Sequence, residues 1–154
     1  MEFQDAKRDS AAGFSLLELI VVLSIVAIAA ALVVPPGRGP NAKASLDRAA
    51  ASLAATLRIA KAESQRKSTD QTVTLDLDHG SYWSDAEPQQ KSFGQRINVT
   101  IQDDTFEWAG NTRRIRIQPG GSATGGTIVL ADGTARARVT LDWLTGSTRL
   151  SLGQ

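Results

Sequence analysis

A single carboxylate in a long apolar segment is the first feature of this sequence that suggests chemistry. From Phe14 to Val34 the only ionisable residue is Glu18. A carboxylate costs about 2.5 to 3.5 kcal/mol at a bilayer centre and less near the interface, so it is expected to have a partner. Glu18 could lie one helical turn inside the membrane and reach water or headgroups. Alternatively, its partner is the α-amino group of Phe14 on a neighbouring subunit, freed by cleavage after Gly13.

Two other groups of residues have the types of a binding site. Asp76, Asp78 and His79 could supply metal ligands, but a polar turn at the end of a strand explains their spacing more simply. The glycine-rich segment 120–126 looks like a phosphate-binding loop. It lacks the Gly-Lys-Ser/Thr ending, and a strand pattern follows it where a helix would be needed. We therefore predict no metal site and no cofactor.

Four arginines form the last candidate site. Alternation along a strand places Arg114 and Arg116 on its outer face, and it places Arg136 and Arg138 on the outer face of another strand. If these two strands pair, four guanidinium groups share one face. Such a face could be solvated and screened, or it could bind carboxylates of an adjacent subunit or phosphates of DNA.

The composition argues against an enzyme and against bulk binding of polyanions. The chain has no cysteine, one histidine, and no nucleophile beside a recognisable base. Its 17 Lys and Arg residues against 16 Asp and Glu give a formal net charge of +1, which is not the charge of a nucleic-acid-binding domain. We predict a protein that acts by association, with one ordinary folded domain beyond the apolar segment.

The apolar segment has the length of a membrane span. Its roughly 21 residues would rise about 31 Å as a helix, close to a hydrocarbon core of about 30 Å. Basic residues occur on both sides of it, so charge alone leaves the orientation open. Pro35 and Pro36 follow directly and remove backbone donors, which predicts a break in the helix there.

A second helix is predicted from an N-cap at Asn41 to about Arg66. Its apolar residues recur at helical spacing and form one stripe, at Leu46, Ala50, Leu53, Leu57 and Ala60. One face of this helix should therefore pack against another element.

From Gln71 onward the apolar period changes from that of a helix to that of a strand. The alternating segments are TVTLDLD, RINVTIQ, RRIRIQ, TIVLAD, TARARVTLD and TGSTRLSL. Asp132-Gly133 between two apolar runs predicts a hairpin, and a turn at Thr145 and Gly146 precedes the last strand. A long helix followed by antiparallel strands predicts an α+β fold in which a sheet covers the helical stripe.

The segment GFSLLELIVVLSIVAIAAALVVP resembles the class III signal of type IV pilins and pseudopilins. The resemblance implies that prepilin peptidase cuts between Gly13 and Phe14 and N-methylates Phe14. It also implies that Glu18 is needed for methylation and for docking the subunit into a filament. The implied organisation is a cytoplasmic leader over residues 1–13, followed by a single inner-membrane helix over 14–34. A periplasmic amphipathic helix over 35–68 and a periplasmic β-rich domain over 69–154 complete it.

Two C-terminal segments, IQPGGSATGGTIVL and VTLDWLTGSTRL, resemble the H-type minor pseudopilins of type II secretion and the related FimT and FimU minor pilins. This resemblance implies a pilin-like fold. It also implies a structural subunit at or near the pseudopilus tip that supports assembly and protein export across the outer membrane. Its partners would be other minor and major pseudopilins.

The alternative function is that of a FimT/FimU-like minor type IV pilin that binds DNA during DNA uptake. DNA-binding FimT-like proteins carry a Gly-Arg-x-Arg motif near the C-terminus, where this chain reads Gly146-Ser147-Thr148-Arg149. The missing first arginine argues against nucleic acid as a partner. The segment from residue 69 to residue 111 resembles no family pattern.

Overall fold

The computed structural model describes residues 15–33, 40–102 and 105–153. The predicted cleavage site at Gly13 and Phe14 lies outside these residues, and so does the predicted helix break at Pro35 and Pro36. The chain divides into two compact units, which are described separately below.

The first unit, Met1–Pro36, contains one described helix, α1 (Leu16–Val33). Ser15 begins it, since its hydroxyl accepts a hydrogen bond from the Leu17 N–H at 3.3 Å and its carbonyl accepts one from the Leu19 N–H at 3.1 Å. In the described part of the chain, no helix combines the length and the hydropathy that crossing a membrane requires. The span predicted over 14–34 extends beyond the described residues at both ends and stays a prediction.

The second unit, Gly37–Gln154, is built on helix α2 (Pro40–Lys67). The helix begins one residue before the predicted N-cap, at Pro40, whose missing N–H costs nothing in a first helical turn. The predicted stripe is confirmed, because every one of its members is fully buried: Leu46, Ala50, Leu53, Leu57 and Ala60.

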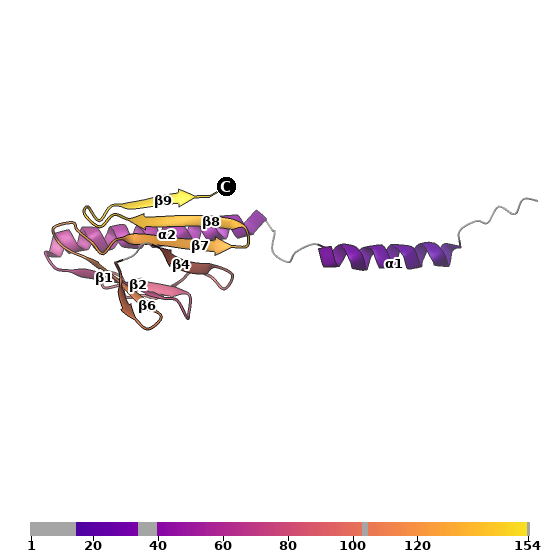
Figure 1. Ribbon diagram of the computed structural model, residues 1–154, viewed down its shortest axis with the longest axis horizontal. Coiled ribbons are helices and arrows are strands. Elements are labelled where there is room, and N and C mark those ends of the chain that lie inside the picture. Colours follow the sequence, from indigo (N-terminus) through magenta and orange to yellow (C-terminus); the bar gives the residue numbers. More distant parts are fainter. Residues whose placement is uncertain (1–14, 34–39, 103–104, 154) are drawn as a thin grey trace, which may run out of the picture. The chain divides into compact units, whose positions relative to one another are not determined.

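Two antiparallel sheets, rather than one, cover this helix (Figure 1). The first sheet has the order β3-β2-β1-β6-β5. Its strands are β1 (Gln71–Asp76), β2 (Ser81–Ser84), β3 (Lys91–Ser92), β5 (Glu107–Ala109) and β6 (Thr112–Ile117). The second sheet has the order β4-β7-β8-β9. Its strands are β4 (Asn98–Gln102), β7 (Gly126–Asp132), β8 (Ala135–Leu141) and β9 (Thr148–Leu152).

The inward faces of both sheets follow the alternation that the sequence predicts. In the first sheet Val73, Leu75, Ile115 and Ile117 are fully buried. In the second sheet the inward residues are Ile128, Leu130, Ala137, Val139 and Leu141, none more than 2% exposed. These side chains form one core with the stripe of α2, so the second unit completes its own hydrophobic core.

The predicted hairpin also forms. Asp132 pairs with Ala135 at the end of β7 and β8, so the loop between them consists of Gly133 and Thr134. Gly133 has a φ of 60°, in the left-handed region that such tight hairpins require. The predicted last strand, β9, also forms, and it pairs antiparallel with β8.

Candidate assembly surfaces

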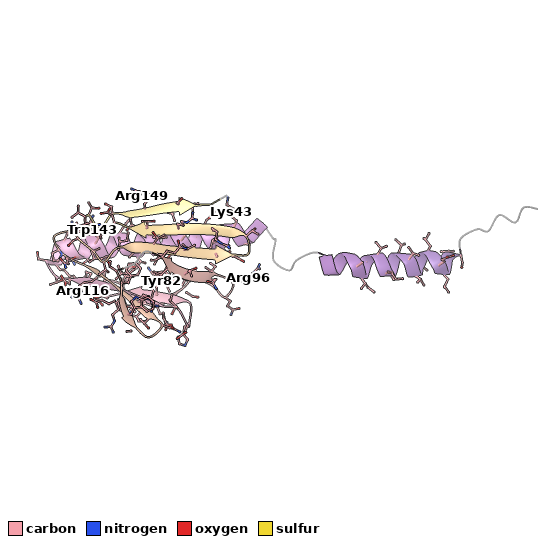
Figure 2. All side chains as sticks on the ribbon, in the orientation of Figure 1. Lys43, Tyr82, Arg96, Arg116, Trp143 and Arg149 are labelled. Atoms are coloured by element: carbon pink, nitrogen blue, oxygen red, sulfur yellow. The ribbon has the colours of Figure 1, made fainter. Side chains whose placement is uncertain are left out.

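The surface of α1 is apolar on every side. Its large apolar residues from Leu16 to Ile28 are all exposed in the isolated chain, from 47% at Val21 to 79% at Leu16. Figure 2 shows side chains leaving the helix on both visible sides. A helix that is hydrophobic all round is stable only when lipid or other helices surround it. The first unit therefore needs apolar neighbours to bury its surface, whereas the second unit has a hydrophobic core of its own.

Glu18 is the exception on this surface. It lies in the first turn of α1, where the helix dipole favours a negative charge, and its side chain is exposed. Among the described residues, none forms a hydrogen bond or ion pair with its carboxylate. The other polar side chain within α1, Ser24, donates its hydroxyl to the Ile20 carbonyl at 2.7 Å, so it is satisfied within the helix.

The four arginines of the predicted patch do not share one face, which corrects the sequence interpretation. All four are exposed, as alternation predicts. However, Arg114 and Arg116 lie on β6, which pairs with β1 and β5, whereas Arg136 and Arg138 lie on β8, which pairs with β7 and β9. The pairing condition failed because β6 and β8 belong to different sheets, and periodicity does not reveal which strands become neighbours.

The arginine that precedes Arg114 on β6 is buried, and it was not identified as a site residue from the sequence. Arg113 is only 7% exposed, and its guanidinium carbon lies 3.3 Å from the ring centre of Trp108 on β5. Its Nη1 donates to the Gly110 carbonyl at 2.8 Å. The alternation that puts Arg114 outside puts Arg113 inside, so the signal was present. The contact stabilises a buried cation against an aromatic face.

The predicted polar turn at Asp76, Asp78 and His79 is confirmed. One carboxylate oxygen of Asp76 accepts the N–H groups of Asp78 and His79, both at 3.1 Å, and the other lies 2.8 Å from His79 Nδ1. The Asp76 carboxylate raises the pKa of His79 through this bond. The backbone N–H of His79 lowers the pKa of Asp76. No group of three acidic, histidine or cysteine side chains in the described residues is arranged to hold a metal ion.

The two C-terminal segments that carry the family resemblance meet in space. Ala123 of the glycine-rich segment donates its N–H to the Trp143 carbonyl at 2.8 Å. Lys61 of α2 donates to the Thr145 carbonyl at 2.6 Å, which ties the β8–β9 loop to the helix. A Cβ at Gly146 would lie 2.5 Å from the Gly121 carbonyl oxygen, so this close approach of two backbones requires glycine.

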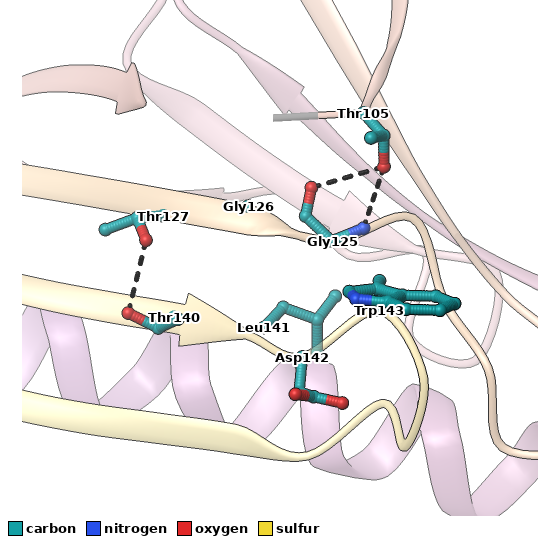
Figure 3. Close-up of a pocket in the computed structure, with 8 residues that line it drawn as sticks. All are labelled: Thr105, Gly125, Gly126, Thr127, Thr140, Leu141, Asp142 and Trp143. Carbon is teal, nitrogen blue, oxygen red and sulfur yellow. Dashed lines mark hydrogen bonds between the residues drawn. The ribbon is translucent and has the colours of Figure 1, made fainter. Parts of the chain in front are cut away.

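A shallow hollow of about 280 Å³ lies beside this junction (Figure 3). Trp143 lines the hollow and is 65% exposed, and the hydroxyl of Thr105, which also lines it, accepts the Gly125 N–H at 3.0 Å. A Cβ at Gly125 would lie 2.7 Å from the Cβ of Trp143. The glycine-rich segment thus joins the strands and does not form a phosphate loop before a helix.

Comparisons with known proteins agree with this architecture. The family model described as Type II transport protein GspH matches residues 49–146, and the prokaryotic N-terminal methylation motif matches residues 8–34. A comparison with curated protein sequences found no significant match.

Two solved proteins share the fold. The minor pseudopilin EpsH from the type 2 secretion system of Vibrio cholerae is 17% identical, with a TM-score of 0.57 over 70% of this chain and 97% of EpsH. The type IV minor pilin FimU of Pseudomonas aeruginosa is 13% identical in two crystal forms, with TM-scores of 0.52 and 0.53. Each covers 71% of this chain, and 93% and 88% of the FimU chains are covered.

The predicted α+β, pilin-like fold is therefore confirmed. The fold and the family are those of structural pseudopilin subunits. The N-terminal motif implies processing by prepilin peptidase, and it is typical of pseudopilins anchored in the inner membrane. The similarity to FimU is weaker and does not favour the minor-pilin alternative. Because its model matches most of the chain, the chain belongs to the type II transport protein GspH family and is a minor pseudopilin of type II secretion.

Proposed function

We propose that this minor pseudopilin occupies a position at or near the tip of the pseudopilus, where it acts by association and not by catalysis. It helps the filament assemble and thereby supports export of folded proteins across the outer membrane. Prepilin peptidase cuts between Gly13 and Phe14 and methylates the new N-terminus. The leader stays cytoplasmic, residues 14–34 cross the inner membrane once, and the second unit lies in the periplasm.

The observation that carries this proposal is Glu18 on an otherwise apolar helix. A carboxylate without a partner is costly once lipid or other helices surround it. In a bundle of such helices, the α-amino group of Phe14 from a neighbouring subunit supplies the missing cation. Pairing then removes the cost of burying either charge alone, so the associated subunits have a lower free energy than isolated subunits in the membrane.

Substituting Glu18 tests this pairing directly. In the Glu18→Ala variant, cleavage after Gly13 should proceed, because the leader lies outside the substitution. Incorporation into filaments should fall at least about tenfold, since removing one member of a buried charge pair leaves the other uncompensated. Crosslinking to the other pseudopilins and secretion of cargo measure incorporation in cells.

A matched control uses the other polar residue of α1. Ser24→Ala removes a hydroxyl that bonds only to the helix backbone, so this variant should assemble like the wild type. Normal incorporation of Glu18→Ala would contradict the pairing. Mass spectrometry of assembled material should find a methylated Phe14 as the first residue, and an intact leader in that material would refute the proposed processing.

A further inference from the structure

Three arginines lie together on the outward face of the second sheet. Arg136 and Arg138 point outward from β8, and Arg149 points outward from β9. Arg138 pairs with Ser151 and Thr140 pairs with Arg149, so Arg138 and Arg149 are diagonal neighbours across the two strands. Diagonal neighbours in a sheet lie about 7 to 8 Å apart, which long side chains can bridge. We call Arg136, Arg138 and Arg149 the arginine face.

The other outward residues of this sheet carry no charge. They are Asn98, Thr100, Gln102, Thr127, Val129, Ala131, Thr140 and Ser151. Within the described residues no carboxylate forms an ion pair with the arginine face. In the described part of the chain, Arg136 donates to two backbone carbonyls, those of Gly133 at 2.7 Å and Ala135 at 3.0 Å.

One carboxylate approaches the arginine face from its end. Asp142 follows β8, and the backbone N–H of Thr145 contributes most to lowering the pKa of its carboxyl, while the charge of Arg149 contributes least. The Oδ1 atom of Asp142 accepts hydrogen bonds from the N–H groups of Leu144 and Thr145 and from the Thr145 hydroxyl. Asp142 therefore stabilises the turn that it begins, and its negative charge offsets part of the positive charge of Arg149.

The outward arginines of the first sheet have an acidic neighbour, unlike those of the second sheet. Arg116 on β6 forms an ion pair with Glu107 on β5 at 2.6 Å, and Glu107 also lies opposite Arg114 in the register of the two strands. Figure 2 labels Arg116 and Arg149, one on each sheet. The chain thus supplies an acidic neighbour for one arginine pair, while like charges stand together on the other sheet at an unfavourable cost.

We propose that the arginine face binds an acidic surface segment of a neighbouring pseudopilin subunit. Guanidinium groups bind carboxylates in a bidentate geometry, and they are favoured at protein interfaces. A hollow of about 340 Å³ lies beside Arg149, lined by the hydroxyl-bearing Thr140 and Thr148 among others, and it can accept a polar side chain of the partner. This inference rests on the proposed function, since it requires neighbouring subunits in a filament.

The charge distribution favours a protein partner over DNA. A nucleic-acid-binding domain carries a strong excess of positive charge along the path of the phosphates. This chain has a formal net charge of +1, and its remaining outward strand arginines lie on the other sheet beside Glu107. Three arginines on a sheet face whose other outward residues are uncharged match a few carboxylates of a protein surface.

A photocrosslinking residue placed at Ser151, between the arginines, tests the proposal in the full chain within cells that carry its secretion system. We expect a crosslink to another pseudopilin, at a segment that contains Asp or Glu. Replacing the face with Arg138→Glu and Arg149→Glu should lower the crosslink yield about tenfold, the size expected when close interfacial charge pairs are lost. Replacing the partner's acidic residues with lysine should then restore the crosslink.

The first sheet offers a matched control. Arg114→Glu and Arg116→Glu reverse the same number of exposed arginines, and the crosslink at Ser151 should stay at the wild-type yield. Circular dichroism of each purified full chain in detergent verifies that the fold is kept. A crosslink that ignores reversal of the face, or that falls equally in the control, would overturn the inference.

Two further outcomes separate this inference from its alternatives. If Ser151 yields no protein crosslink while the wild-type chain still incorporates through Glu18, the arginine face is not an interface and the proposed function stands. If the wild-type chain does not incorporate at all, both fail. Salt-sensitive retention of a short DNA duplex by the purified full chain, lost in the face variant and kept in the control, would overturn the protein partner in favour of nucleic acid.

Discussion

The two helices of this chain complete their burial in different ways. Along α2 the apolar residues form a single stripe. Both sheets cover this stripe, so that Leu53 and Leu57 are fully buried. Along α1 the apolar residues cover every side, and Leu19 and Ile20 stay more than half exposed in the isolated chain. The helix α1 carries only two polar residues, whereas α2 is polar and charged outside its apolar stripe, so the two helices differ in both the amount and the distribution of apolar surface. Its distribution around the axis decides which partners the helix needs.

The same difference holds for charged groups. In the second unit Glu63, Glu87 and Glu107 each have a basic partner within 2.7 Å, supplied by the chain itself. Glu18 on α1 has none among the described residues. These acidic residues of the second unit are paired within the chain, whereas the carboxylate of Glu18 needs a cation that a neighbouring subunit brings. The arginine face is the part of the second unit whose charges also lack an ion-pair partner among the described residues.

Truncating one leucine in each helix gives the largest expected contrast. Leu57→Ala leaves a cavity in a fully buried site and should lower the free energy of unfolding by about 2 to 5 kcal/mol. Leu19→Ala, at a residue 54% exposed, should leave the unfolding of the second unit unchanged. Urea titration of the full chain in detergent, followed by tryptophan fluorescence, measures both because Trp83, Trp108 and Trp143 all lie in the second unit. Similar losses in the two variants would contradict the division into independent units.

The elements of this division could be predicted from periodicity alone. The stripe of α2 and the inward residues of β1, β6, β7 and β8 all lie where the apolar spacing places them. The short strands β2, β3 and β5 could not be predicted, because two to four residues are too few to show a period. Of these strands, β2 contributes to the core through Tyr82, whose ring centre lies 4.6 Å from that of Phe93, the residue after β3.

The candidate site was predictable to a different degree in each unit. Glu18 stands out from the sequence because a lone carboxylate in an apolar segment needs no alignment to be noticed. The arginine patch failed as a prediction, since outward orientation follows from alternation within a strand but strand order does not. Arg149 belongs to the arginine face through the register of β9 against β8, which alternation within a single strand does not give.

The second prediction concerns Gly146, in the loop that connects β8 and β9 and contacts α2. Gly146 has a φ of 59°, and a Cβ there would lie 2.5 Å from the Gly121 carbonyl oxygen, where the β8–β9 loop is tied to Lys61 of α2. Gly146→Ala should therefore destabilise the second unit by about 2 to 3 kcal/mol, from backbone strain and the enforced separation of two loops. Thermal unfolding of the full chain in detergent measures the loss.

Gly133 provides the matched control for this substitution. Its φ of 60° is nearly the same, yet a Cβ there meets nothing within 4 Å. Gly133→Ala should then cost only the conformational strain, about 1 to 2 kcal/mol. If the two variants lost equal stability, the close approach of Gly146 to Gly121 would contribute nothing, and the junction would be looser than its geometry indicates.

The smallest expected effect concerns a charge that the second unit satisfies for itself. Asp76 raises the pKa of His79 above the usual 6.5 through their 2.8 Å contact, and the His79 backbone lowers the pKa of Asp76 below 3.8. A raised histidine pKa stabilises the turn fully below the unfolded value, and this stabilisation is lost as the pH rises through the folded value. The lowered aspartate pKa stabilises it above 3.8 and is lost as the pH falls through the folded value. The turn should thus be most stable between these two ranges.

Because the chain has one histidine, its titration can be followed by NMR without ambiguity. The pKa of His79 should lie above 6.5 in the wild type and should fall towards that value in Asp76→Asn, since the carboxylate that bonds to the ring is gone. Asp78→Asn should lower it less, because Asp78 acts on the ring only through its charge. An unchanged His79 pKa in Asp76→Asn would show that the pair does not form in solution. His79 would then lack an acidic partner, and one of the ion pairs that distinguish the carboxylates of the second unit from Glu18 would be lost.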